Sequence, residues 1–124
     1  MLVKNISKLR RESFRERHDA LVMQIIKALS DKGLGRFWSQ PTGAAYRDNT
    51  LVRYGVIGSA DISGILIGGI RVEIEVKTGQ ATQSDQQKNF ERMIKMFGGI
   101  YIVAHSVDEA LDFLQAAAPP HEVR

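Results

Sequence analysis

Three charged residues in the middle of the chain have the types and spacing of a metal-dependent hydrolytic site. Glu75 and Lys77 lie two apart in a segment where apolar and charged residues alternate, so on a β-strand their side chains share a face. A short hairpin would bring Asp61 from the preceding strand towards that face. Two carboxylates and a strand carbonyl form an oxygen-rich site that suits Mg²⁺ or Mn²⁺. Lys77 beside them can orient a water molecule and stabilise charge developing on a phosphate.

The same pattern also has a plainer interpretation. Alternating Glu and Lys side chains are common on solvent-facing strands, and a Glu-x-Lys pair alone carries little information. Glu73 lies one alternation before Glu75 and shares its face, so it is a second but weaker metal-binding candidate. A functional site therefore requires that Asp61 meets this strand.

The elements that must position these residues follow from hydrophobic periodicity. A helix is expected over residues 12–31, because its apolar residues recur on one face at Val22, Ile25, Ile26 and Leu29. Later helices are expected at 85–97 and 107–114, each preceded by a capping-box pattern (Ser84-x-x-Gln87 and Ser106-x-x-Glu109). Strands are expected at 36–39, 60–67, 70–78 and 100–104, with Gly68-Gly69 as a hairpin turn and 44–57 mostly loop with a strand near 51–56. This order predicts an α/β fold with helices packed on a sheet.

Composition places the chain among ordinary globular proteins and indicates a basic N-terminus. The 124 residues fit one domain, contain no Cys, and include no apolar run long enough for a membrane span. With no signal-peptide pattern at the N-terminus, we expect a cytoplasmic protein. The net charge is +3, but residues 1–18 contribute +4 and the rest sum to −1. Such a segment is either a phosphate-contacting arm, made of Lys4, Lys8, Arg10, Arg11, Arg15 and Arg17, or a solvated helix face.

Four blocks of sequence together resemble the VRR-NUC group of PD-(D/E)XK nucleases. The blocks are 55–64 (GVIGSADISG), 69–79 (GIRVEIEVKTG), 84–90 (SDQQKNF) and 98–103 (GGIYIV). The resemblance covers residues 12–115 and includes the spacing between blocks. It implies a restriction-endonuclease-like fold, a mixed sheet flanked by helices, in a nuclease domain at 12–116. Residues 1–11 would then be a weakly ordered basic lead and 117–124 a tail.

The resemblance also implies roles for individual residues. Asp61 and Glu75 match the metal-binding acids, the carbonyl of Val76 would be a further ligand, and Lys77 matches the catalytic lysine. Gln87 matches a Gln of the family's site, although it can equally serve only to close the capping box with Ser84. The family usually has a supporting Glu in the first helix, and this chain offers Glu16, His18 or Asp19 there. Asp19 is slightly favoured, and His18 is read as a core residue.

Other residues carry plainer expectations. Phe37 and Trp38 are expected in the core. Gly58 either allows a tight turn or lets the backbone approach a phosphate closely. The remaining positions are Tyr46, Arg47 and Arg53, which touch DNA or belong to a solvated loop, and His105 and His121, which are expected at the surface.

The function implied by the resemblance is hydrolysis of DNA phosphodiester bonds with Mg²⁺ or Mn²⁺. Stand-alone members resemble structure-specific nucleases, so we expect a homodimer that resolves four-way (Holliday) junctions. The weak candidates for its shared surface are the first helix and residues 44–56. Alternatives are a flap or general endonuclease, a small restriction enzyme or toxin, and a non-catalytic DNA-binding module on the same fold.

Overall fold

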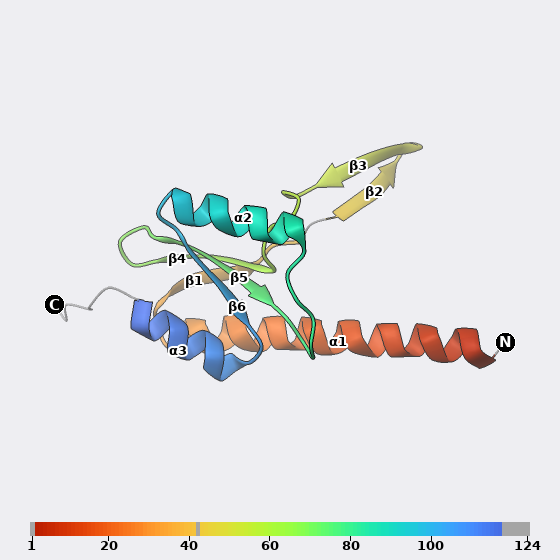
Figure 1. The fold of residues 1–124 in the computed structure, drawn as a ribbon, viewed down its shortest axis with the longest axis horizontal. Coiled ribbons are helices and arrows are strands. Elements are labelled where there is room, and N and C mark those ends of the chain that lie inside the picture. Colours follow the sequence, from red (N-terminus) through yellow and green to blue (C-terminus); the bar gives the residue numbers. More distant parts are fainter. Residues whose placement is uncertain (1, 42, 118–124) are drawn as a thin grey trace.

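The computed structural model describes residues 2–41 and 43–117, which form an α/β fold (Figure 1). Its elements, in chain order, are α1 (Leu2–Asp31), β1 (Gly35–Ser39), β2 (Gly43–Arg47), β3 (Thr50–Tyr54), β4 (Ile62–Leu66), β5 (Arg71–Val76), α2 (Asp85–Met96), β6 (Ile100–Ala104) and α3 (Val107–Ala117). No helix in this described part of the chain is long and apolar enough to cross a membrane.

Four strands form a mixed sheet in the order β1-β4-β5-β6, and β2 and β3 form a separate hairpin. Strands β1, β4 and β5 are antiparallel neighbours, whereas β6 runs parallel to β5. The β4–β5 turn contains Gly68 and Gly69, both at positive φ, which confirms the hairpin turn expected from the sequence. The parallel β5–β6 pair requires a crossover, and α2 provides it.

Helices cover both faces of the sheet, so the molecule has three layers (Figure 1). Helices α1 and α3 pack together on one face, where they enclose the larger apolar core with Ile25, Leu29 and Leu114. Helix α2 lies on the other face, and Phe90 and Ile94 pack there against Tyr101. The alternating apolar and charged side chains of β5 face different layers. Its valines and Ile74 face the larger core, while Glu73 and Glu75 face the α2 layer.

Two parts of the chain extend away from this body, and both differ from the sequence expectation. Helix α1 begins at Leu2, ten residues before the predicted start, because residues 2–17 contain no Gly or Pro to stop a helix. Residues 44–57 are expected to be mostly loop with a strand near 51–56, and β3 lies close to that strand. Strand β2 is not expected, and it forms a hairpin with β3 that turns at Asp48 and Asn49 with φ of 50° and 65°. Every described side chain at 8–11, at 13–17 and in the hairpin is exposed, so neither segment shows the apolar pattern that signals packing.

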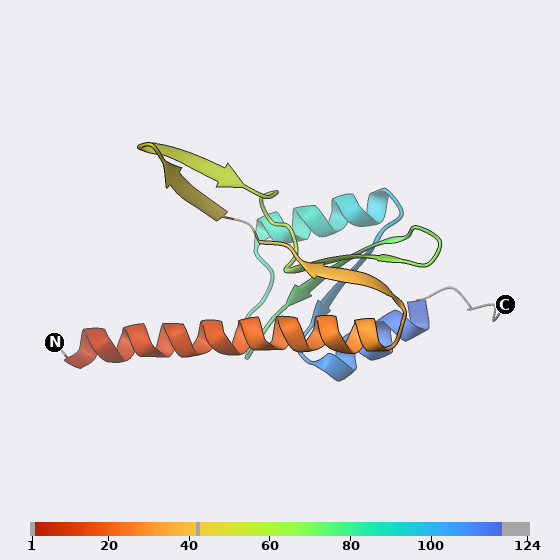
Figure 2. The same cartoon turned by 180° about the vertical axis from the view of Figure 1, so that it is seen from behind.

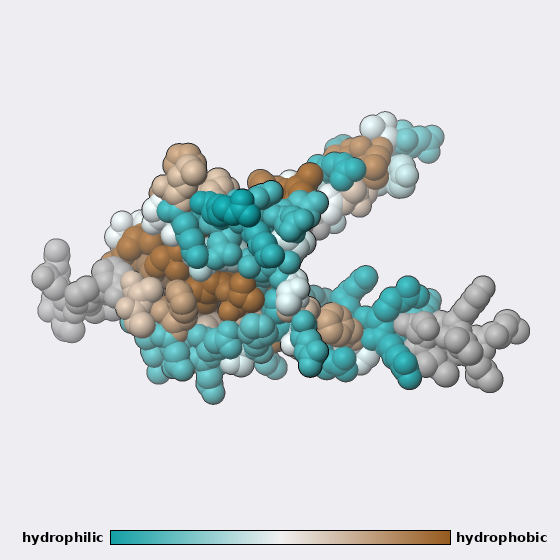
Figure 3. Space-filling view, in the orientation of Figure 1, coloured by the Kyte–Doolittle hydropathy of each residue, from teal (hydrophilic) through white to brown (hydrophobic). Residues whose placement is uncertain are grey.

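The hairpin and the N-terminal half of α1 leave the body at the same end (Figures 1 and 2). The space-filling view shows the space between them open (Figure 3). The candidate site described below lies where these two segments diverge.

Candidate active site

Asp61 is held against the end of β5 by a backbone hydrogen bond. It directly precedes β4, whose Ile62 pairs with Ile74, and this register places Asp61 beside the last residues of β5. The amide of Val76 donates to Asp61 Oδ2 at 2.8 Å. The sequence expectation that a hairpin brings Asp61 to the Glu75 strand is therefore confirmed.

His18 of α1 contacts the same two groups from the other side. Its Nε2 lies 2.9 Å from the carbonyl oxygen of Val76 and 3.3 Å from Asp61 Oδ2. Because a carbonyl oxygen can only accept, Nε2 carries the hydrogen in this arrangement. The other ring nitrogen, Nδ1, is 3.5 Å from Asp19 Oδ1. His18 thus joins the Asp61 carboxylate to the Val76 carbonyl, and Asp19 lies behind it.

The first-helix residue at the site is therefore His18, not the favoured Asp19, and the expectation of a core His18 is wrong. His18 does lie in register with Val22, Ile25 and Leu29, which face the apolar core. However, α1 passes the end of β5 near His18, so the same helix face meets the Val76 carbonyl there instead of apolar side chains. Helix periodicity alone does not reveal where a helix passes the end of a sheet. Glu16 is exposed.

Gln87 connects the first turn of α2 to both Lys77 and Glu75. Its Oε1 accepts hydrogen bonds from the Ser84 amide at 2.9 Å and from Lys77 Nζ at 3.0 Å. Those two donors fix the orientation of the amide, so Nε2 faces Glu75 and donates to its Oε1 at 2.9 Å. The two interpretations of Gln87 are thus combined, since it closes the capping box with Ser84 and also holds two site residues.

Glu75 is buried, so it does not belong to the kind of solvent-facing strand on which alternating Glu and Lys side chains are common. It is 4% exposed, and Lys77 Nζ lies 3.6 Å from its Oε1. Its second oxygen, Oε2, has no hydrogen-bond partner among the described residues. Burial, followed by the negative charge of Asp61, raises the pKa of Glu75 to about 8, although the ammonium group of Lys77 acts against this shift. A second positive charge near Oε2 would favour the ionised carboxylate.

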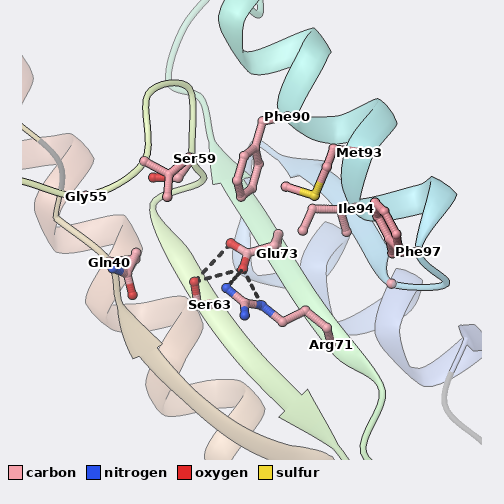
Figure 4. Close-up of a pocket in the computed structure, with 12 residues that line it drawn as sticks. Gln40, Gly55, Ser59, Ser63, Arg71, Glu73, Phe90, Met93, Ile94 and Phe97 are labelled. Atoms are coloured by element: carbon pink, nitrogen blue, oxygen red, sulfur yellow. Dashed lines mark hydrogen bonds and ion pairs between the residues drawn. The ribbon is translucent and has the colours of Figure 1, made fainter.

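Glu73 shares the α2 face with Glu75 but belongs to a different polar cluster (Figure 4). It is completely buried, and its oxygens accept hydrogen bonds from Ser63 Oγ at 2.9 and 3.0 Å and from Arg71 Nε at 2.7 Å. The cluster forms the floor of a cavity of about 440 Å³ whose apolar wall includes Phe90 and Met93 of α2. With its oxygens occupied, Glu73 is not part of the Asp61–Glu75 group.

The donor groups at the site fit a hard divalent cation. Asp61, Glu75 and the Val76 carbonyl supply oxygen atoms, and the buried Glu75 Oε2 is unsatisfied. Within residues 2–41 and 43–117, no group of three or more His, Cys, Asp or Glu side chains has metal-binding spacing. That finding is compatible with Mg²⁺, which proteins commonly bind through one or two carboxylates while water completes its shell. It argues against a site built from side chains alone, such as a structural zinc centre.

Gly58 lies in the loop before Asp61, where this loop packs closely against α2. It adopts φ +80°, and a Cβ at this position would overlap the backbone of Gln86, next to Gln87. Gly58 therefore allows a close approach between the backbone of this loop and α2.

The remaining sequence candidates lie away from the site. Phe37 is buried as expected, whereas Trp38 is 45% exposed and donates to Gln40 Oε1, so its expected place in the core is wrong. Tyr46, Arg47 and Arg53 lie on the exposed hairpin. His105 is at the surface beside Glu109, and His121 lies outside the described residues.

A basic surface adjoins the site through His18. Three arginines of α1 line a shallow hollow with Phe14 and His18: Arg10, Arg11 and Arg15. His18 also lines a second hollow together with Asp61, Gln40 and Pro41, the last of which lies at the root of the hairpin. The exposed arginines, the Asp61 carboxylate and the start of the hairpin therefore follow one another along the surface.

Comparison with protein-family models and with curated proteins finds no match for this chain. The resemblance to VRR-NUC nucleases thus rests on the motif residues of the sequence.

Proposed function

We propose that this protein is a metal-dependent deoxyribonuclease of the VRR-NUC type, with a restriction-endonuclease-like fold, that hydrolyses phosphodiester bonds. The observation that carries the proposal is the convergence of Asp61, Glu75, Lys77 and the Val76 carbonyl at one end of β5. A solvated strand face would not bury Glu75 or leave one of its oxygens unsatisfied.

In this proposal Asp61, Glu75 and the Val76 carbonyl hold Mg²⁺ or Mn²⁺. The cation supplies positive charge beside the scissile phosphate and makes a neighbouring water molecule more acidic. Lys77, positioned by Gln87, donates a hydrogen bond to the attacking water or to a phosphate oxygen and stabilises negative charge there. His18 keeps the Asp61 carboxylate and the Val76 carbonyl in place.

The proposed substrate is DNA, which approaches along the basic surface of α1. Arg10, Arg11 and Arg15 can contact phosphates of a strand whose scissile phosphate lies next to Asp61, because His18 borders both hollows. Four-way junctions are the first substrate to examine and flaps the second, with the protein acting as a homodimer.

A cleavage assay tests the proposal directly. Junction, flap, duplex and single-stranded DNAs are incubated with Mg²⁺ or Mn²⁺, and the wild-type protein is compared with Lys77→Met and Lys88→Met. Lys88 is an exposed lysine of α2 and serves as the matched control. We expect Lys77→Met to lower the rate about 100-fold or more and Lys88→Met to retain it. Binding without cleavage of every substrate by the wild type would instead favour a non-catalytic DNA-binding module.

A further inference from the structure

Strand β6 ends the sheet, and its outer edge is not protected in the usual ways. Within residues 2–41 and 43–117, β5 is the only strand that pairs with β6. Edge strands are normally guarded by charged side chains, proline or a bulge, because their free backbone groups can pair with another chain. The sequence of β6, Ile-Tyr-Ile-Val-Ala, contains neither a charge nor a proline.

Its pairing with β5 shows which backbone groups face outward. The carbonyl of Ala104 accepts from the Lys77 amide, so the main chain of Ala104 faces β5. Because successive residues of a strand direct their N–H and C=O groups to opposite sides, Ile102 also faces β5. Tyr101 and Val103 therefore direct theirs to the open edge.

The surroundings of this edge are apolar. In Figure 3 a hydrophobic area occupies the position that β6 has in Figure 1, between the hydrophilic outer surfaces of α2 and α3. Ile100 and Val103 of β6 are partly exposed. Both flanking helices add exposed apolar side chains, namely Met96 at the end of α2, Phe97 just after it and Phe113 on α3. An open strand edge within an apolar area is typical of a protein interface.

We propose that β6 pairs with β6 of a second copy, antiparallel about a two-fold axis at Ile102, so that two sheets become one. In this register Tyr101 lies opposite Val103 of the other copy, and the same pair recurs on the other side of the axis. All four outward N–H and C=O groups per copy then take part in four hydrogen bonds. Helix α2 of each copy lies on the same face of the joined sheet.

A second copy fits this edge because the outward groups are self-complementary under that symmetry. If the axis passed through Tyr101, Val103 of one copy would lie opposite Gly99 of the other. The Gly99 amide already donates to the Ile94 carbonyl, so it is not available for this pairing. A register centred on Val103 would oppose Tyr101 to His105, which lies beyond the end of β6. The centre at Ile102 is the one that uses only outward groups to which no described residue is bonded. The interface does not involve the Asp61–Glu75 site, so the proposal is independent of nuclease chemistry.

Single cysteines in this cysteine-free chain test the register. At the two-fold axis, the Cα atoms of residue 102 in the two copies would lie about 4.5 Å apart, within the range of a disulfide. Residue 103 of one copy would be displaced from residue 103 of the other by two residues along the strand, which gives about 8 Å and prevents a bond. We expect Ile102→Cys to form a covalent dimer on mild oxidation and Val103→Cys to remain monomeric on a non-reducing gel. Ile102 is 4% exposed and packs in the larger core, so the comparison between the two variants is the decisive result. Equal cross-linking of both variants, or cross-linking of Val103→Cys alone, would overturn the proposal.

Sedimentation at about 10 μM supplies a second measurement with substitutions that preserve the monomer. Phe113→Glu adds a charge to a side chain that is 52% exposed, and Val103→Pro removes an outward N–H at an edge where proline is tolerated. Both are expected to shift the wild-type dimer to monomer, whereas Tyr46→Glu on the hairpin should leave it intact. A wild-type monomer, or loss of the dimer in Tyr46→Glu but not in Phe113→Glu, would exclude the β6 interface.

Discussion

Glu73 and Glu75 make a matched pair, because both are buried acids on the same face of the same strand. Glu73 has its oxygens occupied by Ser63 and Arg71, whereas Glu75 has an unsatisfied oxygen beside Asp61. We expect Glu75→Gln to lower the cleavage rate about 100-fold or more, and Glu73→Gln to change it by less than about threefold. Single-turnover kinetics with excess Mg²⁺ measures both. Equal losses in two folded variants would remove Glu75 from its proposed role.

The raised pKa of Glu75 predicts a pH-dependent stability in the absence of metal. Between the ordinary carboxyl pKa of 4.5 and the folded value of about 8, the unfolded chain is ionised while the folded protein retains the proton. Folding then takes up a proton, so stability falls as the pH rises through this window. In EDTA, Glu75→Gln should therefore melt on the order of 5 °C higher than wild type at pH 9, with a smaller difference at pH 5.

Wild type and Glu75→Gln share every other titrating group. The pH dependence of those groups therefore cancels in the difference between the two melting temperatures. Saturating Mg²⁺ should reduce the difference at pH 9, because the cation stabilises the ionised Glu75 of the wild type and has less effect on Gln. A melting-temperature difference that is constant from pH 5 to pH 9 would show that Glu75 ionises normally in the folded protein.

His18 is expected to act on metal affinity. Its Nε2 contacts the Val76 carbonyl and Asp61, both proposed ligands, so its removal would loosen them. We predict that His18→Ala raises the Mg²⁺ concentration for half-maximal cleavage about 10-fold or more, while the rate at saturating Mg²⁺ changes little. His105→Ala, at the surface, is the control. An unchanged Mg²⁺ dependence for His18→Ala would assign His18 a purely structural role.

The sequence predicts part of the site well, for a physical reason. Asp61, Glu75 and Lys77 meet because strand alternation and a glycine hairpin are local features with fixed geometry. The position of His18 depends instead on where α1 crosses the sheet, which is a tertiary property. The burial of Glu75 likewise depends on α2 lying above it. Charged residues in a strand suggest a solvated face unless another layer covers them.

At the scale of elements, α1 serves two purposes along its length. Residues 22–29 pack on the sheet, whereas the arginines before His18 are exposed. The sequence predicts the packed part from its apolar period. An exposed helix has no such period, so the sequence favours a weakly ordered lead at residues 1–11, whereas α1 in the structure begins at Leu2. The hairpin was harder to predict for the same reason, since side chains exposed on both faces show no alternation.

The exposed arginines predict the salt dependence of DNA binding. Each phosphate contact adds about 0.9 to the slope of log K against log salt concentration. We expect Arg10→Ala/Arg11→Ala to lower this slope by about 1.8. Lys27→Ala/Lys32→Ala removes the same charge near the other end of α1 and should have little effect on the slope. If both double variants lower the slope equally, the protein attracts DNA through its net charge and not through the basic surface beside His18.

At the scale of the whole molecule, the hairpin and the N-terminal half of α1 extend from one end of the body on either side of the site (Figures 1 and 2). An isolated two-stranded hairpin is marginally stable in water, yet this one exposes Tyr46, Leu51 and Tyr54. The ladder register puts Tyr46 and Arg53 on one face of the hairpin and Arg47 and Tyr54 on the other. Each face therefore offers a tyrosine and an arginine, which can contact a base and a phosphate of DNA. The arrangement leads us to expect that α1 and the hairpin hold the substrate between them.

Shortening the hairpin tests this arrangement. Ala44 and Arg53 face each other in the ladder, so replacing residues 45–52 with Asn-Gly leaves a short hairpin with a favourable turn. Because the removed side chains are exposed and lie outside the core, the melting temperature should change by less than about 3 °C.

KM for DNA should rise about 10-fold or more in the shortened protein, because each lost base-stacking contact alone weakens binding by roughly that factor, while kcat stays nearly constant. Asn49→Gly, which keeps the hairpin and suits the positive φ at its turn, should leave KM unchanged. A shortened protein with normal KM would place the DNA on α1 alone, and a large fall in kcat at constant KM would mean that the hairpin acts in the chemical step.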